Sequence, residues 1–403
     1  MNEYKGSLRL SQVAESETLA MAKYVRQLKS QGKDIISFTL GEPDFPTPKH
    51  ICESVYPFLE SGQIKYTPVA GILELREAAA AYFNKISYIP YKTENIIIST
   101  GAKQSIFNAV MALVNPGEEV LIPTPYWVSY SAMVQLAEGI PKYIPTTHEQ
   151  NFKVTPLQLE NSITPKSRLI IFSSPSNPTG SIYTKKELEA LADVILKYPN
   201  LYVISDEIYQ LISYEEPASS LASIPEIFDR TITINGVSKA FSMTGWRIGF
   251  LGAPKWIADL CEKYQGQVTS GANFIAQKAA LAAISSDLTP TYEMVKIFKK
   301  RRDLGIHLFK ELLPNVPLDS PQGAFYFFPN IHQYLNTISP SGQNIKSSEE
   351  LSFFLVENGV AVIPGSAFGA NDYIRLSYAC SEKDIHEGIL RISKALNTLK
   401  KNE

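Results

Sequence analysis

The sequence has few cysteines, no long apolar run and no excess of charge of either sign. Its three cysteines, Cys52, Cys261 and Cys380, are odd in number and far apart, so they form neither a metal-ligand spacing nor a disulfide framework. We expect them to be free, buried thiols in a reducing compartment such as the cytoplasm. The longest apolar runs are far too short to cross a bilayer, and residues 1–10 lack the apolar core of a signal peptide. A formal net charge of −2 gives no electrostatic reason to expect a nucleic-acid or membrane partner.

What is present is the composition of an ordinary large globular protein, with 403 residues of which 44% are hydrophobic and 19% charged. This length allows one large core and a second, smaller one. Between residues 96 and 234, short apolar runs alternate with helix-like segments. The alternation predicts an α/β fold with a mostly parallel sheet covered by helices. The expected strands are 96–99, 119–122, 168–172, 201–205 and 231–234, and the expected helices are 104–113, 129–137 and 185–197.

The pattern changes after residue 288, where Leu288–Leu313 predicts one long helix. Its basic run Lys299–Arg302 is expected to be a solvated helix face. We expect a large domain over residues 46–290 and a smaller α+β domain formed by residues 291–403 with residues 1–45. The smaller domain is expected to contain helices over 18–31 and 382–399 and strands over 34–39, 324–328, 360–363 and 373–377.

Ligands of open α/β sheets bind beyond the carboxyl ends of the strands, and several of these ends carry unusual residues. Gly101 and Ala102 lie between a strand and a helix, an arrangement that lets backbone N–H groups approach an anion such as phosphate. Trp127 could stack on a planar ring, and Asn177 stands between two prolines that would fix its amide. Each of these features alone could also be ordinary, as a glycine turn, a core aromatic or a plain turn.

Other strand ends carry charge. Asp206 follows a predicted strand, where a carboxylate either meets a cation such as a protonated ring nitrogen or caps the next helix, and Tyr209 could reach the same ligand. Lys239 lies among small and apolar residues, where desolvation would lower its pKa and make its amine a better nucleophile, although a surface lysine would also fit. Arg247 suits a phosphate. Arg375, in an apolar strand, suits either a substrate carboxylate or a structural ion pair.

In this order and spacing, the motifs resemble those of the class I (fold type I) aminotransferases, and most closely the bacterial aspartate aminotransferases. The similarity covers nearly the whole chain. It runs from Gly41-Glu42-Pro43-Asp44-Phe45 through Tyr66-Thr67-Pro68 and the Asn177 loop to Lys239–Arg247 and Arg375-Leu376-Ser377-Tyr378-Ala379. The resemblance implies a seven-stranded sheet in a large cofactor domain, pyridoxal 5′-phosphate as cofactor, and a homodimer whose subunits share each active site. No metal is expected.

The resemblance also implies a role for each site residue. Lys239 would hold the cofactor as a Schiff base and shuttle the proton, Asp206 would keep the ring nitrogen protonated, and Tyr209 would bond the ring oxygen. The other implied cofactor contacts are Gly101, Ala102, Lys103, Trp127, Asn177, Ser238, Arg247 and, from the neighbouring subunit, Tyr66. The implied substrate contacts are Gly41, Trp127, Asn177, Arg375 and, for an acidic side chain, Ser16 and Lys103.

The resemblance favours L-aspartate with 2-oxoglutarate, because Ser16 and Lys103 match the positions that meet an acidic side chain. Ala14 stands where many relatives carry a lysine linked to prephenate use, which argues against prephenate. The alternatives on the same scaffold are an aromatic, alanine or prephenate aminotransferase, a β-lyase and an aminocyclopropane-carboxylate synthase. A non-catalytic effector-sensing domain is a further alternative, but it would need a DNA-binding module, for which residues 1–40 are too few.

Overall fold

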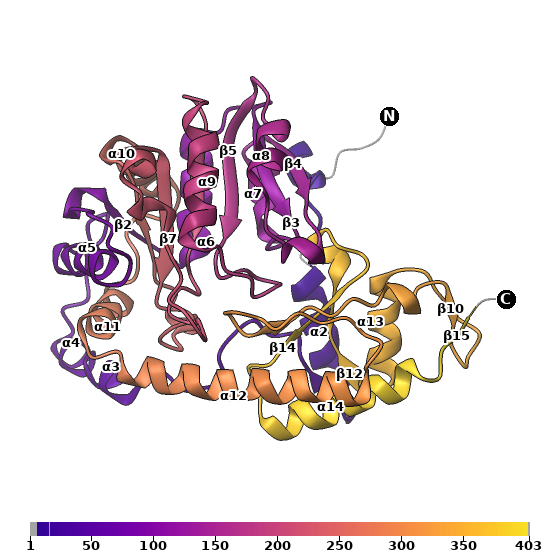
Figure 1. Ribbon diagram of the computed structural model, residues 1–403. Helices are drawn as coiled ribbons and strands as arrows, with labels where there is room; N and C mark the ends of the chain where they lie inside the picture. The colour runs from indigo at the N-terminus through magenta and orange to yellow at the C-terminus, as the bar shows by residue number, and fades with distance from the viewer. Residues whose placement is uncertain (1–5, 16, 402–403) are drawn as a thin grey trace.

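A seven-stranded sheet forms the centre of the larger part of the molecule (Figure 1). The computed structural model describes residues 6–15 and 17–401. The strand order is β2-β8-β7-β6-β5-β3-β4; β8 is antiparallel to both of its neighbours, and the other pairs are parallel. The expected α/β fold with a mostly parallel sheet is confirmed. The strands are β2 (Ile96–Ser99), β3 (Glu119–Thr124), β4 (Ile140–Pro145), β5 (Ser167–Ser173), β6 (Tyr202–Asp206), β7 (Thr231–Gly236) and β8 (Gly249–Gly252).

Helices cover both faces of this sheet, which is why its strands are apolar on both sides. In β2, Ile96 and Ile98 belong to one buried cluster and Ile97 to another on the opposite face. The first cluster includes residues of α5 and α11, and the second includes residues of α6 and α10. The helices of this part are α3 (Lys49–Glu53), α4 (Tyr56–Ser61), α5 (Leu73–Ser87), α6 (Ala102–Leu113), α7 (Ser129–Leu136), α8 (Pro156–Ser162), α9 (Lys185–Leu196), α10 (Lys255–Val268) and α11 (Phe274–Ser285).

The long helix α12 (Thr289–Leu312) runs beneath the sheet and leads to the C-terminal elements (Figure 1). There a small sheet has the order β13-β14-β9, and α12 packs against α14. The N-terminal segment lies with these elements, because its strand β1 (Ile36–Ser37) pairs in parallel with β12 (Val360–Ala361). The remaining α-helices and strands are α1 (Leu8–Ser11), α2 (Glu17–Ser30), β9 (Tyr326–Phe327), β10 (Thr337–Ile338), β11 (Asn344–Ile345), α13 (Ser348–Glu357), β13 (Ile363–Pro364), β14 (Ile374–Ser377), α14 (Glu382–Leu396) and β15 (Lys400–Lys401).

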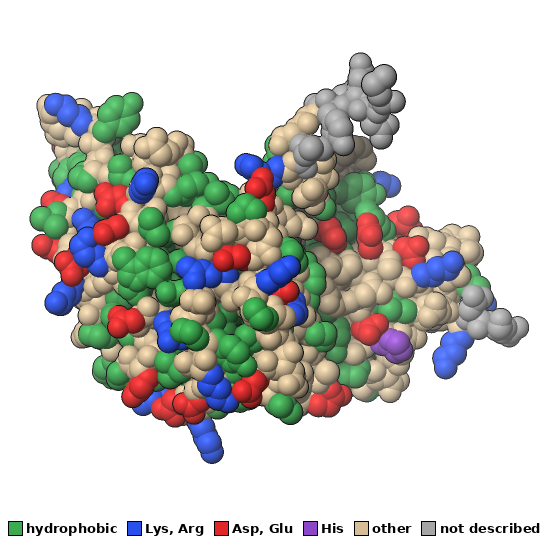
Figure 2. Space-filling view, turned by 90° about the horizontal axis from the view of Figure 1, so that it is seen from above, with side chains coloured by type: hydrophobic (Ala, Val, Ile, Leu, Met, Phe, Trp, Pro, Cys, Tyr) green, Lys and Arg blue, Asp and Glu red, His purple; other side chains and the backbone are tan. Residues whose placement is uncertain are grey.

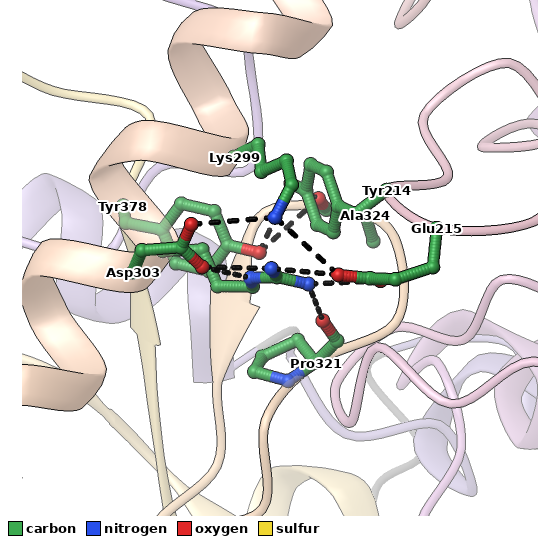
Figure 3. A network of polar contacts seen from close by, with 8 residues as sticks. Tyr214, Glu215, Lys299, Asp303, Pro321, Ala324 and Tyr378 are labelled. Carbon is green, nitrogen blue, oxygen red and sulfur yellow. Dashed lines mark hydrogen bonds and ion pairs between the residues drawn. The ribbon is translucent and has the colours of Figure 1, made fainter.

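The basic run of α12 is not a solvated face throughout, so that expectation is wrong for its two arginines. Arg301 and Arg302 are only 8% and 5% exposed. Arg301 forms two hydrogen bonds with the carboxylate of Asp44, while Arg302 bonds Glu215 and Asp303. In Figure 3, Asp303 on α12 and Glu215 in the loop after β6 approach this guanidinium from opposite sides. A guanidinium can be buried in this way because its planar fork matches carboxylates in two-point contacts.

The cysteines also differ from the expectation in part. All three are free, but only Cys261 is buried, while Cys52 and Cys380 remain partly accessible. Charges of both signs are spread over the face seen in Figure 2, in keeping with the small net charge. No helix within the described ranges is both long and apolar enough to cross a membrane.

Candidate active site

The carboxyl ends of β2, β3, β5, β6 and β7 lie at the same edge of the sheet, since β2 and β7 both run antiparallel to β8. A cavity of about 400 Å³ opens there, bordered also by residues of the C-terminal part. Most of the residues singled out from the sequence line this cavity. They are Gly41, Ala102, Lys103, Trp127, Asn177, Asp206, Tyr209, Ser238, Lys239, Arg247 and Arg375.

Two predicted site residues among those the structure describes, Gly101 and Tyr66, do not line the cavity. Gly101 is buried directly behind it, beside Ala102 and against the Arg247 side chain. Tyr66 is 100% exposed. Ser16 lies outside the described residues.

Asp206 ends β6 and is 4% exposed. Its carboxylate accepts a 2.6 Å hydrogen bond from the hydroxyl of Tyr130 and a 3.3 Å bond from the Ile208 backbone N–H. Burial raises the pKa of Asp206 to about 6, against the opposing effects of these two donors and of the Lys239 charge. The result is a buried carboxylate that faces the cavity and would be stabilised by a cationic partner there.

Tyr130 was not foreseen from the sequence. It lies on α7, three residues after Trp127, and the two rings make an edge contact with centroids 5.5 Å apart. Trp127 precedes the first residue of α7, and the backbone N–H of Tyr130 donates to the Trp127 carbonyl oxygen at 3.0 Å, so the two residues are linked only by a short local turn. The carboxylate that accepts from the Tyr130 hydroxyl belongs to Asp206, 76 residues away, so the local sequence does not reveal this partner.

Lys239 follows β7, and its amine donates a hydrogen bond to the carbonyl oxygen of Gly41. Burial lowers the pKa of Lys239 to about 8, and the Arg247 and Arg375 charges act in the same direction. The Glu42 and Asp206 carboxylates oppose this shift. The Lys239 side chain lines the cavity. Its amine is unprotonated in a larger fraction of molecules at neutral pH than that of an ordinary lysine, which is what a nucleophilic amine needs.

One end of the cavity is suited to an anion. Gly101 has φ +83° and ψ 158°, and a Cβ atom there would lie 2.2 Å from Nη2 of Arg247. The guanidinium of Arg247 therefore packs directly against the turn that begins α6, a helix of 12 residues. The free N–H groups of this helix terminus and the adjacent guanidinium form an arrangement that can hold a phosphate.

A second cation, Arg375, lies on β14 and is only 3% exposed. Its Nη1 donates to Oδ1 of Asn177 at 3.0 Å and its Nη2 to the carbonyl oxygen of Thr39 at 2.9 Å. Among the described residues, its Nε has no hydrogen-bond partner and no carboxylate forms an ion pair with the guanidinium. The structural ion pair considered from the sequence is thus not found in this part of the chain, and a carboxylate entering the cavity could pair with the guanidinium.

Tyr326 is a second residue that sequence reasoning missed. It lines the cavity, and its hydroxyl lies 2.7 Å from the hydroxyl of Tyr209. The Arg375 guanidinium sits over the Tyr326 ring, 4.5 Å from its centroid. Because Tyr326 belongs to the apolar run of β9, its sequence context is that of an ordinary core aromatic.

Comparison with known proteins agrees with this geometry. Residues 33–392 match the family model described as aminotransferase class I and II. The chain is 44% identical over 388 residues to a probable aspartate/prephenate aminotransferase of Rhizobium leguminosarum bv. phaseoli, covering 96% of this chain and 97% of the relative. It is also 44% identical to a Petunia hybrida bifunctional aspartate aminotransferase and glutamate/aspartate-prephenate aminotransferase, covering 98% of this chain and 83% of the relative.

Among solved structures, the aspartate aminotransferase of Rhizobium meliloti superimposes with a TM-score of 0.94 at 37% identity. The superposition covers 98% of this chain and all of that one. Sequence and fold therefore agree over essentially the full length, and the resemblance noted from the motifs is confirmed. The chain belongs to the class I and II aminotransferase family.

Proposed function

We propose that this aminotransferase holds pyridoxal 5′-phosphate in the cavity, with Lys239 as the residue that binds it covalently. The observation that carries the proposal is the placement of three groups around one space. They are an amine of lowered pKa, a buried carboxylate at Asp206, and an anion-binding turn beside Arg247. When bound, pyridoxal phosphate supplies a ring that withdraws electrons from the Cα of the amino acid.

Different residues around the cavity hold different parts of the cofactor. Asp206, held by Tyr130, keeps a proton on the ring nitrogen, and Trp127 covers a ring face. Tyr209 and Asn177 form hydrogen bonds with the ring oxygen of the cofactor. The phosphate is held by Gly101, Ala102, Lys103, Ser238 and Arg247, and by Tyr66 of a second subunit.

The substrate is proposed to be L-aspartate, with 2-oxoglutarate as acceptor. Arg375, oriented by Asn177, binds the α-carboxylate close to the Gly41 backbone, while Lys103 meets the acidic side chain. The predicted contribution of Ser16 falls on a residue outside the described ranges. Once the substrate amine has displaced it from the cofactor, the amine of Lys239 would accept the proton from the substrate Cα and would deliver it to the carbon on the other side of the substrate nitrogen, while the cavity would exclude water from that transfer.

Prephenate is the second candidate acceptor, because the relatives from Rhizobium leguminosarum and Petunia hybrida carry prephenate in their names. Ala14, which stands where many relatives have a lysine, argues against it. Aromatic amino acids and alanine remain lesser alternatives on the same scaffold.

The active unit is proposed to be a homodimer. The support is that Tyr66 is fully exposed, so its side chain is free to reach a second subunit. We further propose that residues 46–290 act as the large domain and residues 1–45 with 291–403 as the small one. The pairing of β1 with β12 supports this division. The three free cysteines support a cytoplasmic location.

The test is a half-reaction screen read by absorbance. Purified protein loaded with pyridoxal phosphate is expected to show a visible cofactor band that shifts on adding L-aspartate and returns on adding 2-oxoglutarate. Lys239→Ala should abolish the cycle while retaining the fold by circular dichroism. A band that never moves would favour an effector sensor, and a Lys239→Ala variant with near-normal turnover would refute the assignment of Lys239.

A further inference from the structure

We propose that Tyr326 is a positioning residue that strengthens the hydrogen bond from Tyr209 to the ring oxygen of the cofactor. This inference rests on the proposed function, since it assumes that pyridoxal phosphate is held by Lys239 with its ring oxygen near Tyr209. It adds a residue that the sequence motifs do not mark and that acts through another side chain.

The geometry places the two hydroxyls in one buried pair. The Tyr209 and Tyr326 oxygens are 2.7 Å apart, and both side chains are almost wholly buried. Their rings meet edge to face, with centroids 5.9 Å apart and an angle of 80° between the planes. A Cβ atom at Gly41 would come within 2.7 Å of the Tyr326 hydroxyl, so the backbone that accepts from Lys239 also borders this pair.

When a cofactor ring oxygen is present, the number of hydroxyl protons determines which tyrosine donates the hydrogen bond between the two hydroxyls. Each hydroxyl has one proton, and their mutual hydrogen bond uses one of the two. If Tyr209 donates to the ring oxygen, the proton between the tyrosines must come from Tyr326. Tyr209 then accepts one bond while it donates another, which polarises its O–H group and makes it a stronger donor.

The surrounding charges favour this direction. Burial raises the pKa of the Tyr326 hydroxyl, and the charge of Arg375, which lies over the ring, lowers it. The Glu42 charge has a weaker, raising effect. Around Tyr209, the charges of Arg375 and Asp206 act on the hydroxyl pKa in opposite directions, and the Lys239 amine lies 5.8 Å from the ring centroid. Burial keeps the pKa of both hydroxyls above the ordinary value, so both stay protonated and able to donate at neutral pH.

The pair also connects two parts of the site. Tyr209 follows β6 of the seven-stranded sheet, whereas Tyr326 lies on β9, beside β14 and Arg375. The guanidinium that is proposed to bind the substrate carboxylate is therefore in contact with the residue that supports Tyr209. In this way Tyr326 joins the substrate end of the cavity to the ring oxygen of the cofactor.

The experiment is a pH titration of the visible absorption of the cofactor-loaded protein, which does not depend on turnover. A hydrogen-bond donor at the ring oxygen stabilises negative charge on that oxygen. This stabilisation is greatest when the lysine–cofactor linkage has lost its proton, so weakening the donor raises the pH at which the proton is lost. Tyr326→Phe should therefore raise the midpoint by roughly 0.3 pH unit or more, as expected for a fraction of one hydrogen bond. Tyr209→Phe should raise it further, and the double variant should match Tyr209→Phe alone.

Tyr378→Phe is the matched control. Tyr378 is buried and shares a 3.0 Å hydroxyl–hydroxyl bond with Tyr214 (Figure 3). It is not among the residues that line the cavity. It should leave the midpoint unchanged. An unchanged midpoint in Tyr326→Phe, or additive shifts in the double variant, would overturn the inference.

The Lys239→Ala variant distinguishes failure of the Tyr326 inference from failure of the proposed function. If Lys239→Ala keeps the same titrating band, the covalent role of Lys239 is wrong. If the band is lost in Lys239→Ala while Tyr326→Phe titrates like the unsubstituted protein, only the role of Tyr326 is wrong.

Discussion

The side-chain nitrogen of Lys103 lies 5.1 Å from the centroid of the Trp127 ring, at the border of the cavity. Burial lowers the pKa of Lys103, and the nearby charge of Arg247 lowers it further. No carboxylate of the described residues forms an ion pair with this amine. A cation in this position would be stabilised by an acidic side chain of a substrate.

Lys103→Ala is therefore expected to raise the KM for L-aspartate by about tenfold or more, as for loss of one charge-assisted hydrogen bond, and to change the KM for phenylalanine much less. Half-reactions with each amino acid measure the two effects. Lys49→Ala is the control, because the Lys49 side chain is exposed and pairs with Glu53 at the surface. Equal effects of Lys103→Ala on both amino acids would rule out the dicarboxylate assignment.

Glu207 is a buried carboxylate, 1% exposed, that does not line the cavity. One oxygen accepts from the hydroxyls of Ser205 at 2.8 Å and Ser220 at 2.6 Å, and the other has no hydrogen-bond partner among the described residues. Burial raises the pKa of Glu207 to about 8, the two serines oppose this, and the Asp206 charge adds to it. The folded protein thus binds a proton at Glu207 more tightly than the unfolded chain does.

Because the folded pKa is raised, the stability linked to this proton is fully present below the unfolded value near 4.5 and is lost as the pH rises through about 8. Glu207→Gln keeps the shape and cannot ionise, so its free energy of unfolding should decline less between pH 5 and pH 9, by on the order of a few kcal/mol. Urea unfolding at several pH values measures this, with exposed Glu189→Gln as the control. Parallel pH profiles for the unsubstituted protein and Glu207→Gln would contradict the argument.

Residues at strand ends could be predicted because local sequence carries the signal. An apolar run that ends in Asp206 or leads to Lys239 marks both the strand and its edge, and the structure brings these side chains into one cavity. The strands β4 and β8 were not foreseen. β8 has only four residues with a glycine at each end, and β4 is exposed over much of its length, so neither has the pattern of a buried strand.

Partners that come from distant segments could not be predicted. Tyr326 reads as a core aromatic until its hydroxyl is seen beside that of Tyr209, 117 residues away. Arg302 reads as part of a charged helix face until Glu215 folds against it. In both cases a polar atom on an amphipathic side chain is satisfied by long-range packing, which periodicity does not encode.

Tyr66 provides a test of the shared active site. Since its side chain is wholly exposed, Tyr66→Ala should leave the subunit folded but lower activity if the tyrosine serves a second subunit. Mixing Tyr66→Ala with Lys239→Ala protein under conditions of subunit exchange should restore activity. In a hybrid dimer, one site would combine an intact Lys239 with an intact Tyr66 of the other subunit. No recovery in verified hybrid dimers would show that Tyr66 does not act across the interface.

The turn at Gly101 allows a comparison of backbone strain with loss of the anion site. Gly101 and Gly117 have similar positive φ angles, +83° and +80°, but an added Cβ meets Arg247 at Gly101 and nothing within 4 Å at Gly117. Alanine at either position should cost about 1 kcal/mol or more of unfolding free energy, because side chains disfavour this backbone region.

Only Gly101→Ala is expected to displace the Arg247 guanidinium, and it should weaken pyridoxal phosphate binding by about tenfold or more, since a charge-assisted hydrogen bond contributes roughly 1.5 kcal/mol or more. Equilibrium binding of the cofactor to both variants, followed by absorbance, measures the difference. If Gly117→Ala lost as much affinity as Gly101→Ala, general destabilisation would explain the result. A selective loss in Gly101→Ala would instead mean that the contact between this turn and Arg247 forms the phosphate site, because the two substitutions differ in what the new methyl group touches.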